Sequence, residues 1–185
     1  MHNNFLYVNG DRFIEFIDKE KIQNRIKELA LEISKDYKNS VPIFIGVLNG
    51  AFIFMADLLK NITIEAEVDF FKLSSYGDSK ISSGQVKMIK DLNCNPNGRD
   101  IIIVEDIVDT GLSIKYIEEL FQHYNPKSMK VVTLLLKPES LKYEVKIDYI
   151  GFKIPSQFVI GYGLDYQQKY RNLPSIYILS NDGVN

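Results

Sequence analysis

The chain has 185 residues, of which 45% are hydrophobic, and its formal net charge at pH 7 is −2. A chain of this length can bury a core, so we expect residues 1–185 to form a single globular domain and not a disordered protein. The slightly acidic balance offers no general basic surface for nucleic acid, and no apolar run approaches the roughly 18 residues that a membrane helix needs. The one cysteine, Cys94, excludes an intramolecular disulfide, and residues 1–11 lack the pattern of a signal peptide, so we expect a cytoplasmic protein.

Predicted strands and helices alternate along most of the chain. Residues 18–37 carry apolar side chains at helical spacing, and Asp18 is suited to cap that helix. Strands are then predicted over residues 42–48, 64–73, 86–89, 101–108, 129–136 and 149–152, helices over 51–60 and 111–123, and a mobile polar loop over 74–85. This alternation favours an α/β fold with a mostly parallel central sheet flanked by helices. We expect residues 158–180 and the termini to form a small hood over the C-terminal strand edge.

The stretch over residues 101–113 is the most informative part of the sequence. Its β-branched run over residues 101–104 suits a strand buried on both faces, and Glu105 and Asp106 follow at once. Asp109 comes three residues later and precedes Thr110-Gly111-Leu112-Ser113, which suits a tight turn that opens a helix. Backbone N–H groups at a helix start lack partners. The segment therefore combines carboxylates for hydroxyls or a metal with a cradle for a phosphate.

An ordinary turn would also explain part of this pattern. Asp109 or Thr110 could simply cap the helix that follows, as happens in many α/β proteins. Three carboxylates within five residues, however, repel one another unless something cationic or rich in hydroxyl groups lies beside them. Open α/β sheets also bind ligands in the cleft outside the C-terminal ends of their strands, where these side chains should lie. We therefore favour a binding site.

Residues 104–111, Val-Glu-Asp-Ile-Val-Asp-Thr-Gly, resemble the phosphoribosyl pyrophosphate signature of the type I phosphoribosyltransferases. The Glu-Asp pair resembles more narrowly the form found in hypoxanthine-guanine phosphoribosyltransferases. Further segments resemble the same family in the same order: residues 47–51, 54–58, 74–76, 134–137, 158–166 and 170–173. The resemblance extends from residue 13 to residue 180 and implies the type I phosphoribosyltransferase fold.

The resemblance implies a role for each residue of the signature. Glu105 and Asp106 would bind the ribose 2- and 3-hydroxyls, and with Asp165 they would help to hold Mg2+, which prefers oxygen ligands. A solvated acidic turn is the alternative interpretation of the pair. The 5-phosphate would be bound by the segment of Asp109, Thr110, Gly111, Leu112 and Ser113. Its backbone N–H groups and hydroxyls would donate hydrogen bonds, and the dipole of the helix that follows would add a positive field.

A purine base would be read by residues outside the phosphate loop, according to the same resemblance. Asp109 would face N7 as acceptor or general base, and Lys137 would donate to the exocyclic O6. Phe158 would stack on the ring, the Val159 backbone would read its edge, and Asp165 would lie nearby. Adenine would place an amino donor against the Lys137 ammonium, which is itself a donor, so neither group would find an acceptor. An unpaired buried polar group costs about 1–3 kcal/mol, and we therefore expect 6-oxopurines as substrates. Lys137 could instead be an ordinary strand end, and Phe158 and Val159 ordinary core.

The resemblance also implies a pyrophosphate site formed by Asn49, Gly50, Ser75, Tyr76 and Arg171. In the family the peptide bond that enters the residue at Asn49 tends to be cis, and relatives often carry a basic residue there. Asn49 departs from that pattern because it offers an amide and no charge. Residues 74–85 would close over the site and exclude water. A hairpin tip in solvent and a surface arginine are the alternative interpretations.

The resemblance thus implies a hypoxanthine-guanine phosphoribosyltransferase of purine salvage. Its substrates would be phosphoribosyl pyrophosphate and a 6-oxopurine base, its cofactor Mg2+, and its assembly a homodimer or homotetramer, with neither nucleic acid nor membrane as a partner. Two alternatives stay open. A related transferase could also use xanthine, and a phosphoribosyltransferase-like regulator could bind RNA, although the acidic composition argues against the latter.

Overall fold

The computed structural model describes residues 5–75, 86–90 and 92–180. Its central sheet has six strands in the order β5-β4-β3-β6-β7-β8. All neighbours in this sheet are parallel except β4 and β5, which form an antiparallel pair. The strands are β3 (Ile43–Leu48), β4 (Glu67–Ser75), β5 (Val86–Lys90), β6 (Asp100–Val108), β7 (Ser128–Leu136) and β8 (Tyr149–Lys153). The prediction of a mostly parallel α/β sheet is therefore confirmed.

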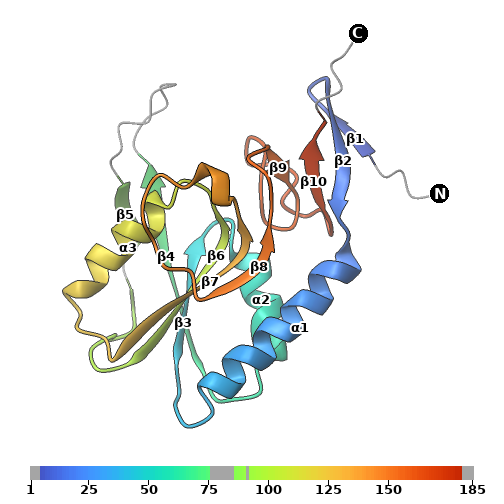
Figure 1. The fold of residues 1–185 in the computed structure, drawn as a ribbon. Helices are drawn as coiled ribbons and strands as arrows, with labels where there is room; N and C mark the ends of the chain where they lie inside the picture. The colour runs from blue at the N-terminus through green and yellow to red at the C-terminus, as the bar shows by residue number, and fades with distance from the viewer. Residues whose placement is uncertain (1–4, 76–85, 91, 181–185) are drawn as a thin grey trace.

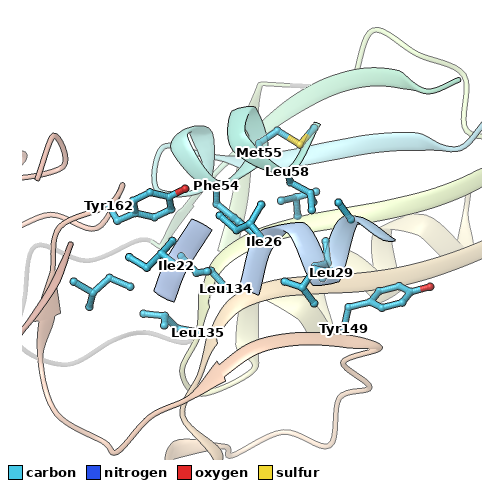
Figure 2. Packing of buried hydrophobic residues seen from close by; sticks show 14 of the residues in the cluster. Ile22, Ile26, Leu29, Phe54, Met55, Leu58, Leu134, Leu135, Tyr149 and Tyr162 are labelled. Carbon is cyan, nitrogen blue, oxygen red and sulfur yellow. The ribbon is translucent and has the colours of Figure 1, made fainter. Parts of the chain in front are cut away.

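Helices cover both faces of this sheet, as Figure 1 shows. The helices are α1 (Lys19–Asp36), α2 (Phe52–Asn61) and α3 (Leu112–Gln122), and a short 3-10 helix, η1, spans Pro138–Ser140. Ile102 and Val104 of β6 join the hydrophobic cluster beneath α1 and α2, whereas Ile101 and Ile103 join the cluster beneath α3. Burial on both faces explains why the run over residues 101–104 is apolar without alternation. Figure 2 shows side chains of the first cluster.

A second, smaller sheet forms the predicted hood. Its four antiparallel strands follow the order β1-β2-β10-β9. They are β1 (Phe5–Val8), β2 (Asp11–Ile17), β9 (Val159–Ile160) and β10 (Ile176–Leu179). Val8, Phe13 and Ile160 form the centre of its own small hydrophobic cluster. In Figure 1 the hood stands at the end of the molecule toward which the parallel strands point. No helix in the described part of the chain is long and apolar enough to cross a membrane.

Most predicted element boundaries agree with the structure, and Asp18 caps α1 by accepting a hydrogen bond from the Lys21 N–H at 2.9 Å. The prediction for the second strand is wrong at both ends. β4 begins at Glu67, because its first partner on β3 is Ile43, and it runs on to Ser75 because β5 pairs with that end. The predicted loop over 74–85 thus loses its first two residues to β4, and the rest lies outside the described residues.

Candidate active site

Predicted site residues lie at the C-terminal ends of neighbouring parallel strands. β6 ends at Val108, β7 ends just before Lys137, and β3 ends just before Asn49. Because β6 pairs with β3 on one side and with β7 on the other, the three ends meet at one edge of the sheet. This edge is where open parallel sheets bind ligands.

The turn between β6 and α3 forms a small concave cradle. A cavity of about 90 Å3 is lined by Glu105 and by the continuous segment over residues 107–114. Gly111 is the N-cap of α3 and has a φ of 85°, a left-handed conformation that favours glycine. The first turn of α3 contains no acidic side chain, so no carboxylate within that turn opposes the positive end of the helix dipole at the cradle. The cradle therefore suits a phosphate.

The ordinary-cap interpretation of this turn is wrong. Neither Asp109 nor Thr110 is the N-cap of α3, and the N-cap makes no side-chain hydrogen bond. The Thr110 hydroxyl oxygen accepts only a long hydrogen bond, 3.4 Å, from the Leu112 N–H. The Thr110 carbonyl oxygen instead accepts the N–H of Lys142 at 2.9 Å, which ties the turn to the segment after η1. Ser113 is exposed at the start of the helix.

Two adjacent carboxylates stand beside the cradle without cationic partners. Glu105 is buried, Asp106 is half-buried, and neither forms an ion pair within the part of the chain that the structure describes. Burial and the charge of Asp106 raise the pKa of Glu105 well above its usual value. Burial also raises the pKa of Asp106 to about 6, although the hydrogen bond donated by the Ile107 N–H lowers this pKa in part. The pair is therefore a place where hydroxyl donors or a cation would be strongly stabilised.

A larger cavity connects this pair to the loop after β3. Its volume is about 350 Å3, and its lining includes Leu48 and Gly50 of that loop, both carboxylates and Ser113 of the phosphate cradle. The cavity is thus large enough to join a sugar site to sites for two phosphate groups. No group of three or more His, Cys, Asp or Glu side chains among the described residues is arranged to hold a metal ion.

Lys137 and Asp109 form an ion pair at this edge of the sheet. The Lys137 Nζ lies 2.8 Å from Asp109 Oδ2, and the Lys137 side chain is 9% exposed against 48% for Asp109. The backbone N–H of Lys137 donates to the carbonyl oxygen of Val108 at 3.0 Å, which fixes the two strand ends beside each other. Lys137 is therefore not a strand end that reaches into water. It presents a buried donor next to a half-exposed acceptor.

Phe158 and Val159 differ in their exposure. The Phe158 ring is 45% exposed and touches Phe13 and Tyr166 only edge to face, so the core interpretation of Phe158 is wrong. Val159 is buried, as the core interpretation expects of its side chain. Its strand, β9, is an edge strand of the hood sheet, which leaves one side of the β9 backbone without a strand partner. An aromatic face and a free backbone edge are thus available to a planar ligand.

The loop after β3 is held between Asp106 and the hood. The peptide bond between Leu48 and Asn49 is cis, as the resemblance implied, and Asn49 is exposed. A Cβ on Gly50 would overlap the Asp106 carboxylate, and a Cβ on Gly163 would overlap the Gly50 carbonyl oxygen. Only glycines fit these two contacts.

Arg171 and Asp165 pair with each other within the hood loop. The Arg171 Nη2 lies 2.7 Å from Asp165 Oδ1, and Nη1 donates to the Gly163 carbonyl oxygen at 2.7 Å. Asp165 Oδ2 also accepts the Gln168 N–H at 2.8 Å. The charge of Arg171 lowers and that of Asp165 raises the pKa of Asp106, which places this pair near the carboxylates of β6.

Two predicted residues cannot be placed fully. Ser75 is the last residue of β4, at the same edge of the sheet, although its side chain is not described. Tyr76 lies outside the described residues, as does the remainder of the predicted lid. Sequence reasoning missed Gly163, whose only signal was the Gly-Tyr-Gly run over residues 161–163.

Comparison with known proteins agrees with this geometry. The family model described as a phosphoribosyl transferase domain matches residues 15–167, and the chain therefore belongs to the phosphoribosyltransferase family. The hypoxanthine-guanine phosphoribosyltransferase of Bacillus subtilis (strain 168) is 52% identical over 163 residues, which are 88% of this chain and 91% of that protein. The crystal structure of a hypoxanthine phosphoribosyltransferase from Staphylococcus aureus superposes with a TM-score of 0.87 at 41% identity, over 97% of this chain and 94% of that one.

A longer relative contains a similar segment as one part of its chain. The bifunctional protein TilS/HprT of Listeria monocytogenes serotype 4b (strain F2365) is 45% identical over 179 residues, 97% of this chain but only 26% of that protein. The family resemblance and the fold class expected from the sequence are both confirmed by these matches.

Proposed function

We propose that this protein transfers the 5-phosphoribosyl group of phosphoribosyl pyrophosphate to N9 of hypoxanthine or guanine. The products are IMP or GMP and pyrophosphate, so the reaction serves purine salvage. One observation carries the proposal. Glu105 and Asp106, which form no ion pair with any described residue, adjoin a concave helix start, in a chain whose similar proteins are named hypoxanthine-guanine phosphoribosyltransferases.

In this mechanism the sugar phosphate binds to β6 and the turn after it. Glu105 and Asp106 accept hydrogen bonds from the ribose 2- and 3-hydroxyls, and the N–H groups around Gly111 surround the 5-phosphate. N9 of the base forms a bond to the anomeric carbon as the bond to pyrophosphate breaks. Positive charge develops on the sugar in that step, and the nearby carboxylates stabilise it. Catalysis rests mainly on positioning and electrostatics.

The base lies between Phe158 and the Lys137–Asp109 pair. The Lys137 ammonium donates to O6 of a 6-oxopurine, and Asp109 accepts the proton that the ring loses at N7 as N9 attacks. Adenine would place an amino group against Lys137, and an unpaired buried polar group costs about 1–3 kcal/mol, more when it is charged. Discrimination against adenine follows from that cost.

The carboxylate pair also fits Mg2+. Two adjacent carboxylates that form no ion pair with any described residue are suitable oxygen ligands. Mg2+ would keep several waters and substrate oxygens, so a cluster of three protein ligands is not required. Bound Mg2+ would neutralise charge on the leaving pyrophosphate. Glu105 and Asp106 would hold it, whereas Asp165 would contribute only by sharing its carboxylate with Arg171.

Pyrophosphate would lie against the loop of Asn49 and Gly50, with Arg171, Ser75 and Tyr76 as further donors. Arg171 is always charged, and in its present position it already borders the Gly50 loop through Gly163. A homodimer or homotetramer, a cytoplasmic location and a single domain over residues 1–185 stay predictions from the sequence.

Neither alternative function is favoured. The similar proteins carry the name of the hypoxanthine-guanine enzymes, and the Lys137–Asp109 pair suits any 6-oxopurine without selecting xanthine. A regulator that binds RNA would need a basic face, which the net charge of −2 does not suggest.

The proposal is tested by nucleotide formation from phosphoribosyl pyrophosphate and Mg2+ with hypoxanthine, guanine, xanthine and adenine in turn. We expect turnover of hypoxanthine and guanine, none of adenine, and a large loss of activity in Asp109→Asn and Lys137→Ala. No turnover of any base would contradict the proposal. A marked preference for xanthine would replace it with the xanthine alternative.

A further inference from the structure

The hood loop that carries Arg171 is attached to the core by a part-buried hydrogen bond between a tyrosine and a helix carboxylate. The Tyr162 hydroxyl donates to Asp57 Oδ2 at 2.6 Å, and the Gln23 side-chain amide donates to the same oxygen at 2.7 Å. Asp57 lies in the middle of α2 and Gln23 in α1, whereas Tyr162 follows β9 in the hood. One carboxylate thus joins two helices of the core to the hood.

Tyr162 is held in a defined orientation. Its side chain is buried with Ile22 and Phe54 in the cluster of Figure 2, and only 3% of the residue is exposed. Its φ is 51°, in the left-handed region, and its N–H donates to the Leu173 carbonyl oxygen at 2.9 Å. A non-glycine residue in that region persists only where surrounding contacts stabilise it. Burial raises the pKa of Tyr162, as does the charge of Asp57, so the hydroxyl stays a donor.

Residue 163 transmits this attachment to the candidate pyrophosphate loop. Gly163 follows Tyr162 directly and rests against the Gly50 carbonyl oxygen. Its N–H donates to the Arg171 carbonyl oxygen at 2.9 Å, and its own carbonyl oxygen accepts from the Arg171 guanidinium at 2.7 Å. The position of the Arg171 charge is therefore set through Gly163 by the residue before it.

The loop of Gly50 leads into the same helix that carries Asp57. The Phe52 N–H donates to the Asn49 carbonyl oxygen at 3.4 Å, and Met55 N–H to Ala51 at 2.8 Å, so the loop and α2 are continuous. The hood segment is consequently bonded to the middle of α2 through Tyr162 and Asp57, and it lies against the loop before α2 where Gly163 approaches the Gly50 carbonyl oxygen. Two points of attachment fix an orientation that one contact alone would leave free.

We propose that Asp57 and Tyr162 are positioning residues for phosphoribosyl pyrophosphate, because their hydrogen bond sets Gly163 and Arg171 against the Gly50 loop. This inference rests on the proposed function of the site. Neither residue touches substrate. Their effect is on the pyrophosphate half of the site. The Lys137–Asp109 pair, which would contact the base, directly follows the ends of β7 and β6 and does not contact Asp57 or Tyr162.

Tyr162→Phe is the direct test, since it removes the hydroxyl and keeps the ring. A matched control is Tyr149→Phe. The Tyr149 hydroxyl donates to Asp36 Oδ2 at 2.6 Å, so this bond also joins a buried ring to a helix carboxylate. Tyr149 is the first residue of β8 and Asp36 the last of α1, so the bond lies at the opposite end of the sheet from the site. Both changes should lower thermal stability to a similar extent. Only Tyr162→Phe should raise the KM for phosphoribosyl pyrophosphate, by about tenfold, with the KM for hypoxanthine and kcat at saturation nearly unchanged.

A second variant and a second measurement separate this inference from the proposed function. Asp57→Asn keeps an oxygen that can accept the Tyr162 bond, so its KM should lie between those of the wild type and Tyr162→Phe. Calorimetric titration with phosphoribosyl pyrophosphate and Mg2+ reports the same loss of affinity without any turnover. Equal affinity in the wild type and Tyr162→Phe overturns the positioning role even when turnover is normal. A wild type that binds the sugar phosphate but converts no base contradicts only the proposed function.

Discussion

Substitution of Gly50 by alanine should separate ligand binding from stability at this site. The Cβ of Gly50→Ala would overlap the Asp106 carboxylate, which cannot withdraw without losing the hydrogen bond from the Ile107 N–H at 2.9 Å. Overpacking of this kind costs about 1–3 kcal/mol. For a chain of this size that loss lowers Tm by roughly 2–12 °C.

Gly50→Ala should also weaken ligand binding. Asp106 is expected to hold a ribose hydroxyl, and its displacement removes a charge-assisted hydrogen bond of about 1.5–3 kcal/mol. The dissociation constant for phosphoribosyl pyrophosphate should therefore rise by about 10- to 150-fold, measured by calorimetric titration in Mg2+.

Gly46→Ala is the matched control for this substitution. Gly46 lies in β3, and a Cβ there would overlap the Phe70 ring, 2.8 Å from Cδ1, and would lie 3.7 Å from Met55 Cγ. The control should lose stability and keep its affinity for the sugar phosphate. If Gly50→Ala binds as tightly as the wild type, the contact between Gly50 and Asp106 does not shape the binding site and the reasoning is refuted.

Two further predictions concern acid stability and base affinity. Burial raises the pKa of Asp69, but hydrogen bonds from the backbone N–H groups of Cys94, Phe70 and Asn93 outweigh it and lower the pKa below its usual value. A lowered pKa contributes stability above the unfolded value near 3.9 and loses it as pH falls. Asp69→Asn should thus be about 1–3 kcal/mol less stable at pH 7, with the difference narrowing below pH 4 in denaturant titrations. Equal acid sensitivity in both proteins would contradict this. Phe158→Ala should raise the KM for hypoxanthine about tenfold, as expected for loss of a stacking ring. Its Tm should change little because the ring is 45% exposed, and an unchanged KM would exclude stacking.

Local sequence was sufficient to predict the strands of the central sheet, the three helices and the turn that opens α3, but not the individual strands of the hood. The unbroken apolar run over residues 101–104 is typical of a strand with both faces covered, and glycine at position 111 is typical of a left-handed turn. The end of β4 was predicted wrongly because its extent depends on pairing with β3 and β5, which are separate segments.

Only the tertiary structure decided the contacts between residues that are distant in sequence. The Lys137–Asp109 pair joins residues 28 positions apart, and the Tyr162–Asp57 bond joins residues 105 positions apart. Such contacts arise from the strand order and from how the hood packs on α2, which no local pattern specifies. The sequence by itself determined which chemical groups stand at the strand ends. The packing of the sheet, helices and hood determined which of those groups meet, because side chains interact over a few ångströms and only the folded chain brings them that close.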